Sequence, residues 1–169
     1  YSSGIYGDNL ADYPEIPNQV RLNIISASPL SEAEKLELYW ASLQEIIERL
    51  VKSNKTIWLM DPIPELPMHI GEAVFPYSIF GGDRVLANLM LATPREYYFE
   101  RHRFILERLN SLTYGDSLIR IPVYDLLCNE LGCPAVSENS ALYFDDDHLS
   151  VEGSRILFDR FLEIKEINI

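Results

Sequence analysis

The sequence has 169 residues, of which 47% are hydrophobic and 24% are charged, as expected of a single globular domain that buries about 70% of its unfolded surface. Fourteen basic and 26 acidic residues give a formal net charge of -12, which repels phosphate backbones and argues against nucleic acid as a partner. The longest apolar runs, such as Ile57 to Met60, are far shorter than the roughly 18 residues that a membrane-spanning helix needs.

Residues 1–30 combine glycine, proline, asparagine and serine with scattered apolar residues, and they show no sustained hydrophobic period. This pattern predicts irregular chain. Because domains of alternating strands and helices usually open with an apolar strand, we expect the chain to be the carboxyl-terminal part of a larger domain. The single domain expected over residues 1–169 therefore has an irregular lead-in.

The first predicted helix runs from Ser31 to Lys52. Ser31 and Glu34 have the spacing of a capping box. Apolar residues recur on one face at helical spacing, namely Leu36, Tyr39, Trp40, Leu43, Ile46, Ile47 and Leu50. A turn then leads to Thr56 to Met60, an apolar run without polar alternation that predicts a buried parallel strand.

Three prolines follow this strand within Asp61 to Pro67, so this segment is predicted to be a loop. It lies at the strand's carboxyl end, where ligands bind in open α/β sheets. Residues 68–92 are ambiguous, with a turn expected at Gly81-Gly82 and a short helix at Val85 to Leu91.

A second helix is predicted to begin after Thr93. Thr93, Pro94 and Glu96 supply a cap, a favoured first-turn proline and another capping box. The apolar stripe of this helix consists of Tyr98, Ile105, Leu109 and Leu112.

Two further elements complete the chain. Leu118 to Tyr124 reads as a strand, although Pro122 argues against a central place in the sheet. Ser150 is expected to cap a last helix from Val151 to Glu166. The order helix, strand, helix, strand, loop, helix predicts an α/β fold with a layered parallel sheet, and no internal repeat competes with it.

Asp145 and His148 are the residues best suited to chemistry. On a loop before a helix, a carboxylate can fold back to an imidazole three residues further on and fix its tautomer, so that the other ring nitrogen faces a nucleophile. Asp146 and Asp147 can instead face the amino end of the helix. A solvated capping run with an incidental histidine explains the residues equally well. A metal site is less favoured, because no other cluster at ligand spacing supports it.

Cys128 and Cys133 lie five residues apart, with Gly132 between them able to let the chain fold back. A disulfide here would indicate an extracytoplasmic protein. Two unlinked thiols in a reducing compartment remain equally consistent with the sequence.

The terminal motif of the chain is Asp145-x-x-His148-Leu149-Ser150, followed by Gly153. It resembles the last block of the SGNH (GDSL-type) hydrolase superfamily. More narrowly, the chain resembles the periplasmic SGNH domains fused to integral-membrane acyltransferases that O-acetylate carbohydrates. The segments that carry the resemblance are Trp58 to Glu65, Tyr124 to Cys128, Cys133, and Leu142 to Val151.

The resemblance implies a three-layer, flavodoxin-like SGNH fold with a parallel sheet, incomplete at its amino end. It implies that His148 is the general base, that Asp145 is its orienting acid, and that Cys128 and Cys133 form a disulfide. The parent protein would be a periplasmic carbohydrate O-acetyltransferase or esterase tethered to the inner membrane, without a cofactor or metal. Its partners would be an acyl donor, a carbohydrate acceptor, the rest of the SGNH domain and a membrane acyltransferase domain.

The rival interpretation is a non-catalytic carbohydrate-binding or interaction module on the same scaffold. Trp40, Trp58 and the ten tyrosines can supply aromatic sugar platforms, although at helical or strand spacing most are expected in the core.

The family's nucleophile lies in a Gly-Asp-Ser block that follows the first strand and opens the first helix. Gly115-Asp116-Ser117-Leu118 repeats these letters, but a predicted helix precedes it and a predicted strand follows it. Ser117 is therefore expected at the amino edge of the sheet, opposite the edge that presents a nucleophile. Gly7-Asp8-Asn9 likewise lacks a preceding strand and the family's order Gly-x-Asn-Asp. We expect the serine and the oxyanion donors to be absent from this chain, which alone should be catalytically silent.

Overall fold

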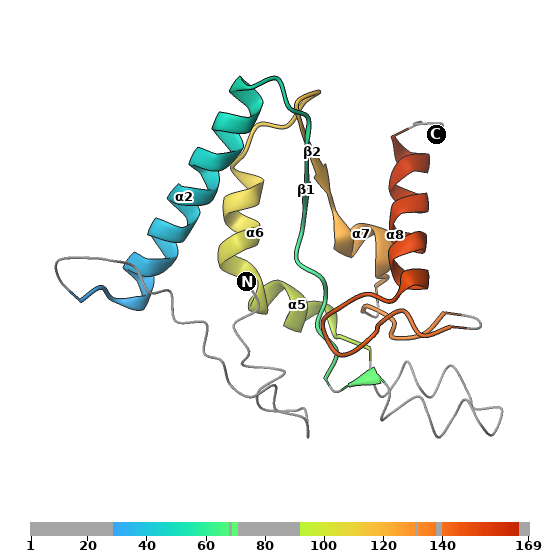
Figure 1. The fold of residues 1–169 in the computed structure, drawn as a ribbon. Helices are drawn as coiled ribbons and strands as arrows, with labels where there is room; N and C mark the ends of the chain where they lie inside the picture. The colour runs from blue at the N-terminus through green and yellow to red at the C-terminus, as the bar shows by residue number, and fades with distance from the viewer. Residues whose placement is uncertain (1–28, 68, 71–91, 131, 138–139, 166–169) are drawn as a thin grey trace, which may run out of the picture.

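The computed structural model describes residues 29–67, 69–70, 92–130, 132–137 and 140–165 (Figure 1). The elements are α2 (Glu32–Lys52), β1 (Ile57–Met60), α5 (Arg95–Arg101), α6 (Arg103–Asn110), β2 (Leu118–Ile121), α7 (Val123–Leu127) and α8 (Val151–Ile164). The predictions for residues 1–28, including Gly7-Asp8-Asn9, and those for Gly81-Gly82 and Val85 to Leu91 lie outside the described residues.

The two strands form a parallel sheet between layers of helix. Ile57 is in register with Leu118, and Met60 with Ile121. Helices α2 and α6 lie on one side of the strands, and α7 and α8 on the other (Figure 1). The predicted α/β fold with a parallel sheet is therefore confirmed.

The face of the sheet toward α8 is only partly covered by the described elements. Ile119 and Ile121 of β2 pack in one cluster with Leu157 and Phe161 of α8. On β1, the ring of Trp58 meets that of Phe161 edge-on at a centroid distance of 5.3 Å, yet 42% of Trp58 and 43% of Met60 are exposed. The prediction that β1 is a buried strand is wrong, because α8 lies mainly over β2.

Helix α2 follows its sequence signals closely. The Ser31 hydroxyl accepts from the backbone N–H of Glu34, and the Glu34 carboxylate accepts from the Ser31 N–H at 2.8 Å, so the predicted capping box is confirmed. Trp40 and Ile47, two turns apart, are buried. Neither α2 nor any other helix in the described ranges is long and apolar enough to span a membrane.

The second predicted helix differs from expectation in two ways. It is broken at His102 into α5 and α6, and the residue at its N-cap is Pro94, which makes no side-chain capping bond. Thr93 is buried, and its hydroxyl donates to the carbonyl of Glu65. His102 is buried against Tyr98, and burial lowers the pKa of its imidazole to about 4, so this ring is neutral at physiological pH.

Strand β2 is shorter than the predicted strand from Leu118 to Tyr124. It ends at Ile121, and Pro122 occupies the N-cap of α7. Proline cannot donate to a strand ladder and its fixed φ suits a helix start, which explains why the apolar run changes from strand to helix at this residue.

Candidate active site

The predicted site residues lie on a tight loop between Tyr143 and Leu149, which precedes α8. We call it the site loop. Tyr143 and Leu149 form an antiparallel bridge at its base, and the N–H of Phe144 donates to the carbonyl of His148 at 2.8 Å. Tyr143 is buried with Leu66 in the core. The side chain of His148 at the tip remains 68% exposed, so the loop presents the imidazole outward from a fixed base.

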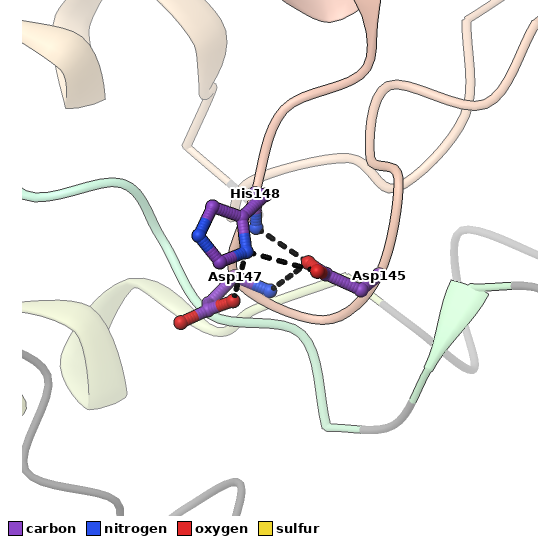
Figure 2. A group of neighbouring side chains, drawn as sticks. All are labelled: Asp145, Asp147 and His148. Carbon is purple, nitrogen blue, oxygen red and sulfur yellow. Dashed lines mark hydrogen bonds and ion pairs between the residues drawn. The ribbon is translucent and has the colours of Figure 1, made fainter. Parts of the chain in front are cut away.

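Asp145 folds this loop and orients the histidine at the same time (Figure 2). Its Oδ1 accepts from the backbone N–H groups of His148 and Asp147, at 2.7 and 3.1 Å. Its Oδ2 lies 2.9 Å from Nδ1 of His148. Partial burial acts to raise the pKa of Asp145, but these hydrogen bonds and the charge of His148 outweigh it and lower the pKa. The predicted contact between Asp145 and His148 is therefore present, with the carboxylate ionised at neutral pH.

Asp147 also contacts the imidazole, which the sequence did not predict. Its Oδ1 lies 2.7 Å from Nδ1 of His148, and Figure 2 shows its carboxylate beside the ring. The sequence also allowed this side chain to face the amino end of the last helix. The run of three aspartates before the histidine was the only signal, and it does not say which carboxylates turn toward the ring.

The proline loop after β1 and the residues that follow it are hydrogen-bonded to the backbone of the site loop. The N–H of Leu66 donates to the carbonyl of Asp146 at 2.7 Å, and the N–H of Ile70 donates to the carbonyl of Asp145 at 3.3 Å. The prediction that this loop follows the strand's carboxyl end is confirmed, and the site lies at that edge of the sheet.

A buried ion pair holds this supporting loop in place. Nη2 of Arg101 lies 2.9 and 2.8 Å from the two carboxylate oxygens of Glu65. The two side chains are only 6% and 5% exposed. Burial raises the pKa of Glu65, while Arg101 acts in the opposite direction.

The disulfide is connected to the proline loop through Thr93, whose hydroxyl donates to the carbonyl of Glu65. Cys128 and Cys133 are joined, which confirms the predicted pairing, and Cys133 exchanges backbone hydrogen bonds of 2.9 and 3.1 Å with Thr93. Gly132 has φ of +132°, and a Cβ there would lie 2.3 Å from the Thr93 carbonyl oxygen. Only glycine fits this close approach without strain.

The amino end of α8 fastens the other side of the site loop. Ser150 accepts from the N–H of Gly153 at 3.0 Å, which confirms its predicted capping role, and its hydroxyl donates to the carbonyl of Ala141 at 2.7 Å. The backbone N–H of Ser150 donates to the carbonyl of Leu142 at 2.9 Å. The helix start therefore lies directly against the chain that leads into the loop.

Gly153→Ala is expected to lower the free energy of unfolding by about 2–3 kcal/mol, because overpacking against rigid backbone costs that much. A Cβ at this position would lie 2.1 Å from the carbonyl oxygen of Leu142. Helix propensity alone predicts the opposite sign, since alanine favours a helix over glycine by about 1 kcal/mol. Urea unfolding measures the difference. Gly115→Ala is the matched control, because no atom lies within 4 Å of its Cβ position; equal effects of the two substitutions would contradict the steric argument.

Ser117 lies at the other end of the sheet. Its carbonyl accepts from the N–H of Ile57 at 2.9 Å, so it precedes the first paired residues of two parallel strands. The site contacts the loop that follows their last paired residues. The predicted placement of Ser117 at the amino edge is therefore confirmed.

Asp145, Asp147 and His148 also form a group whose ligand atoms lie within 4.8 Å of one another. The nitrogen Nδ1 of His148 is in direct contact with both carboxylates, at 2.9 and 2.7 Å. The separation of 2.9 Å between Nδ1 and Oδ2 of Asp145 is also an ordinary hydrogen-bond distance, so the same atoms form the hydrogen-bonded pair that an acid–base site needs.

Comparison with known proteins identifies a family and a solved structure. The family described as SGNH domain (fused to AT3 domains) matches residues 4–163. The solved structure is the periplasmic domain of a lipopolysaccharide acetyltransferase from Salmonella ser. Paratyphi A, which is 19% identical with a TM-score of 0.54, a likeness that shows the fold. The match covers 85% of this chain and 54% of that chain, so this chain spans about half the length of the solved domain. No curated protein gives a significant match.

Proposed function

The chain belongs to the family of SGNH domains fused to AT3 domains, and on this premise we propose that it supplies the acid–base part of a serine-dependent acyl-transfer site. His148 is the general base and Asp145 its orienting acid. The observation that carries the proposal is the 2.9 Å contact between Asp145 Oδ2 and Nδ1 of the exposed His148. This contact holds the imidazole with its second nitrogen directed away from the carboxylate.

The reaction proceeds in two acyl-transfer steps. The serine oxygen attacks the carbonyl carbon of an acyl donor while His148 takes its proton, and the leaving group departs with a proton returned by His148. In the second step His148 takes the proton of an acceptor hydroxyl, whose oxygen attacks the acyl-serine ester; the acyl–serine bond breaks, and the serine oxygen leaves with the proton returned by His148. Asp145, whose pKa is lowered, stays ionised and stabilises the imidazolium in both steps.

The serine is contributed by a further part of the SGNH domain that extends the sheet beside β1. Among the described strands, β1 pairs with β2, and its residues Trp58 and Met60 remain exposed. A strand added along β1 would end beside the site, because the carboxyl ends of parallel strands meet at one edge. The place of Ser117 at the opposite edge supports a nucleophile from elsewhere.

The acceptor class is carbohydrate, and the setting is the periplasm. The similar solved domain is that of a lipopolysaccharide acetyltransferase, and the disulfide Cys128–Cys133 suits an oxidising compartment. The ring of Phe144, 73% exposed immediately before Asp145, offers an apolar surface for a sugar ring. The parent protein would be tethered to the inner membrane by its acyltransferase domain, and the acyl donor would reach the site from there.

The proposal is tested by comparing this chain with the same chain extended to include a Gly-Asp-Ser block. The extended protein is expected to hydrolyse p-nitrophenyl acetate, while this chain shows only the background rate, because the nucleophile and oxyanion donors supply most of the rate enhancement. Hydrolysis by this chain that Ser117→Ala abolishes would contradict the proposal.

A carbohydrate-binding module is the second candidate, favoured by the exposed ring of Trp58. Trp40, the other predicted platform, is buried and cannot serve this role. Glycan binding by this chain that survives His148→Ala, together with an inactive extended protein, would favour the module.

A further inference from the structure

Both oxygens of the Asp145 carboxylate have hydrogen-bond partners within the site loop. Its Oδ1 accepts two backbone N–H groups, and its Oδ2 faces Nδ1 of His148. An asparagine at this position has one acceptor atom and one donor atom on the same group. It therefore cannot accept from the backbone and from Nδ1–H together.

Asp147 approaches the same nitrogen from a second direction. Its Oδ1 lies 2.7 Å from Nδ1, compared with 2.9 Å for Oδ2 of Asp145. The backbone N–H of Asp147 is held by Oδ1 of Asp145, so one aspartate fixes the main chain from which the other reaches the ring. Glu65 in the neighbouring proline loop pairs with Arg101 instead.

Two carboxylates around one nitrogen have a chemical consequence for histidine. The hydrogen bond to Nδ1 is that of Asp145 Oδ2, and it favours the tautomer whose lone pair lies on Nε2. The contact of Asp147 with Nδ1 is an ion pair, so Asp147 acts on the ring through its charge. Two negative charges beside the ring also favour the imidazolium that forms when Nε2 takes a proton.

We propose that Asp147 is a second positioning residue for His148, whose carboxylate, in ion-pair contact with Nδ1, supports the imidazolium beside Asp145 while Nε2 acts as the base. This inference rests on the proposed function. It predicts that each aspartate partly compensates for the loss of the other, so that kcat falls much further when both are replaced than when either one is.

The kinetic test uses the extended, active protein with the variants Asp145→Asn, Asp147→Asn and the double variant. In a triad with a single acid, the asparagine substitution lowers kcat by about 10⁴-fold. Here we expect about 10²-fold for Asp145→Asn, about 10-fold for Asp147→Asn, and about 10⁴-fold or more for the double variant. Asp146→Asn removes the same charge from the same loop and is expected to change kcat less than threefold. Equal losses for Asp145→Asn and the double variant would overturn the inference, as would equal rates for Asp147→Asn and Asp146→Asn.

A second measurement on this chain does not depend on catalysis. The ring protons of His148 are followed by NMR as the pH is raised, with their signals assigned by their loss in His148→Ala. Asp147→Asn is expected to move the titration midpoint down by roughly one pH unit, and Asp146→Asn by much less. Equal midpoints in the two variants would overturn the inference. If the midpoint moves but His148→Ala leaves the extended protein active, the contact stands and the proposed function fails.

Discussion

Replacing His148 with alanine is expected to lower the acetyl-transfer rate of the extended protein by about 10⁴-fold or more. The loss follows from the proposed mechanism, in which the imidazole that contacts Asp145 at 2.9 Å takes the serine proton. Without it the serine is a neutral hydroxyl, which is a poor nucleophile at pH 7. The measurement is kcat for p-nitrophenyl acetate, with an acetylated sugar product as a second readout.

Ser117→Ala is the matched control for this experiment. The substitution removes a serine hydroxyl from a literal Gly-Asp-Ser-Leu sequence, yet Ser117 lies at the amino edge of the sheet, where its backbone meets Ile57. We expect the rate to stay within about twofold of the unchanged protein. A large loss in Ser117→Ala together with retained activity in His148→Ala would reverse the assignment of the site.

Arg101→Met is expected to lower the free energy of unfolding by about 3–5 kcal/mol at pH 7.5, because it leaves the Glu65 carboxylate buried without its cation. Both side chains are at most 6% exposed, so water cannot replace the lost partner. We also expect the site loop to be less firmly held in this variant, because the N–H of Leu66, next to Glu65, donates to the carbonyl of Asp146. Urea unfolding measures the stability.

The pH dependence of this loss has a defined sign. Burial raises the pKa of Glu65 above its ordinary value of 4.5, and Arg101 opposes that rise, so removing Arg101 raises the pKa further. The folded variant then holds a proton that the unfolded chain has released, and its stability increases as the pH falls toward 4.5. The difference from the unchanged protein should therefore shrink between pH 7.5 and pH 5.

Arg108→Met provides the control for the buried pair. Arg108 pairs with Glu37 on the surface, where the side chains are 39% and 54% exposed. Exposed pairs contribute about 0–1 kcal/mol, so this variant should unfold almost like the unchanged protein. Comparable losses in Arg101→Met and Arg108→Met would show that burial does not govern the Glu65 pair.

Elements with strong local signals were predicted well from the sequence. The capping box at Ser31 and the cap at Ser150 both form as expected, because each involves atoms only three residues apart. The contact between Asp145 and His148 belongs to the same class, since it closes within one turn of chain.

Features that depend on distant residues were not predictable in this way. Thr93 has the sequence pattern of a cap, but its hydroxyl donates to Glu65, 28 residues away. The ion pair between Glu65 and Arg101 spans 36 residues, and no local pattern marks it. The exposure of Trp58 likewise depends on where α8 packs, which the composition of β1 does not reveal.

Asp147 shows a different limit of sequence reasoning. Three consecutive aspartates precede His148, and their order does not indicate which carboxylates face the ring. The answer depends on the loop's backbone path, which is set by the hydrogen bonds that Asp145 accepts from two N–H groups.

The contacts that orient His148 come mainly from the site loop itself. Asp145 closes the loop and orients the imidazole through the same carboxylate, and the bridge between Tyr143 and Leu149 holds its two ends. The rotational freedom of the imidazole is thus reduced when the chain folds, before any ligand binds. In the proposed mechanism the serine therefore meets a base that is already preorganised, and little of the activation barrier has to come from reorienting the imidazole.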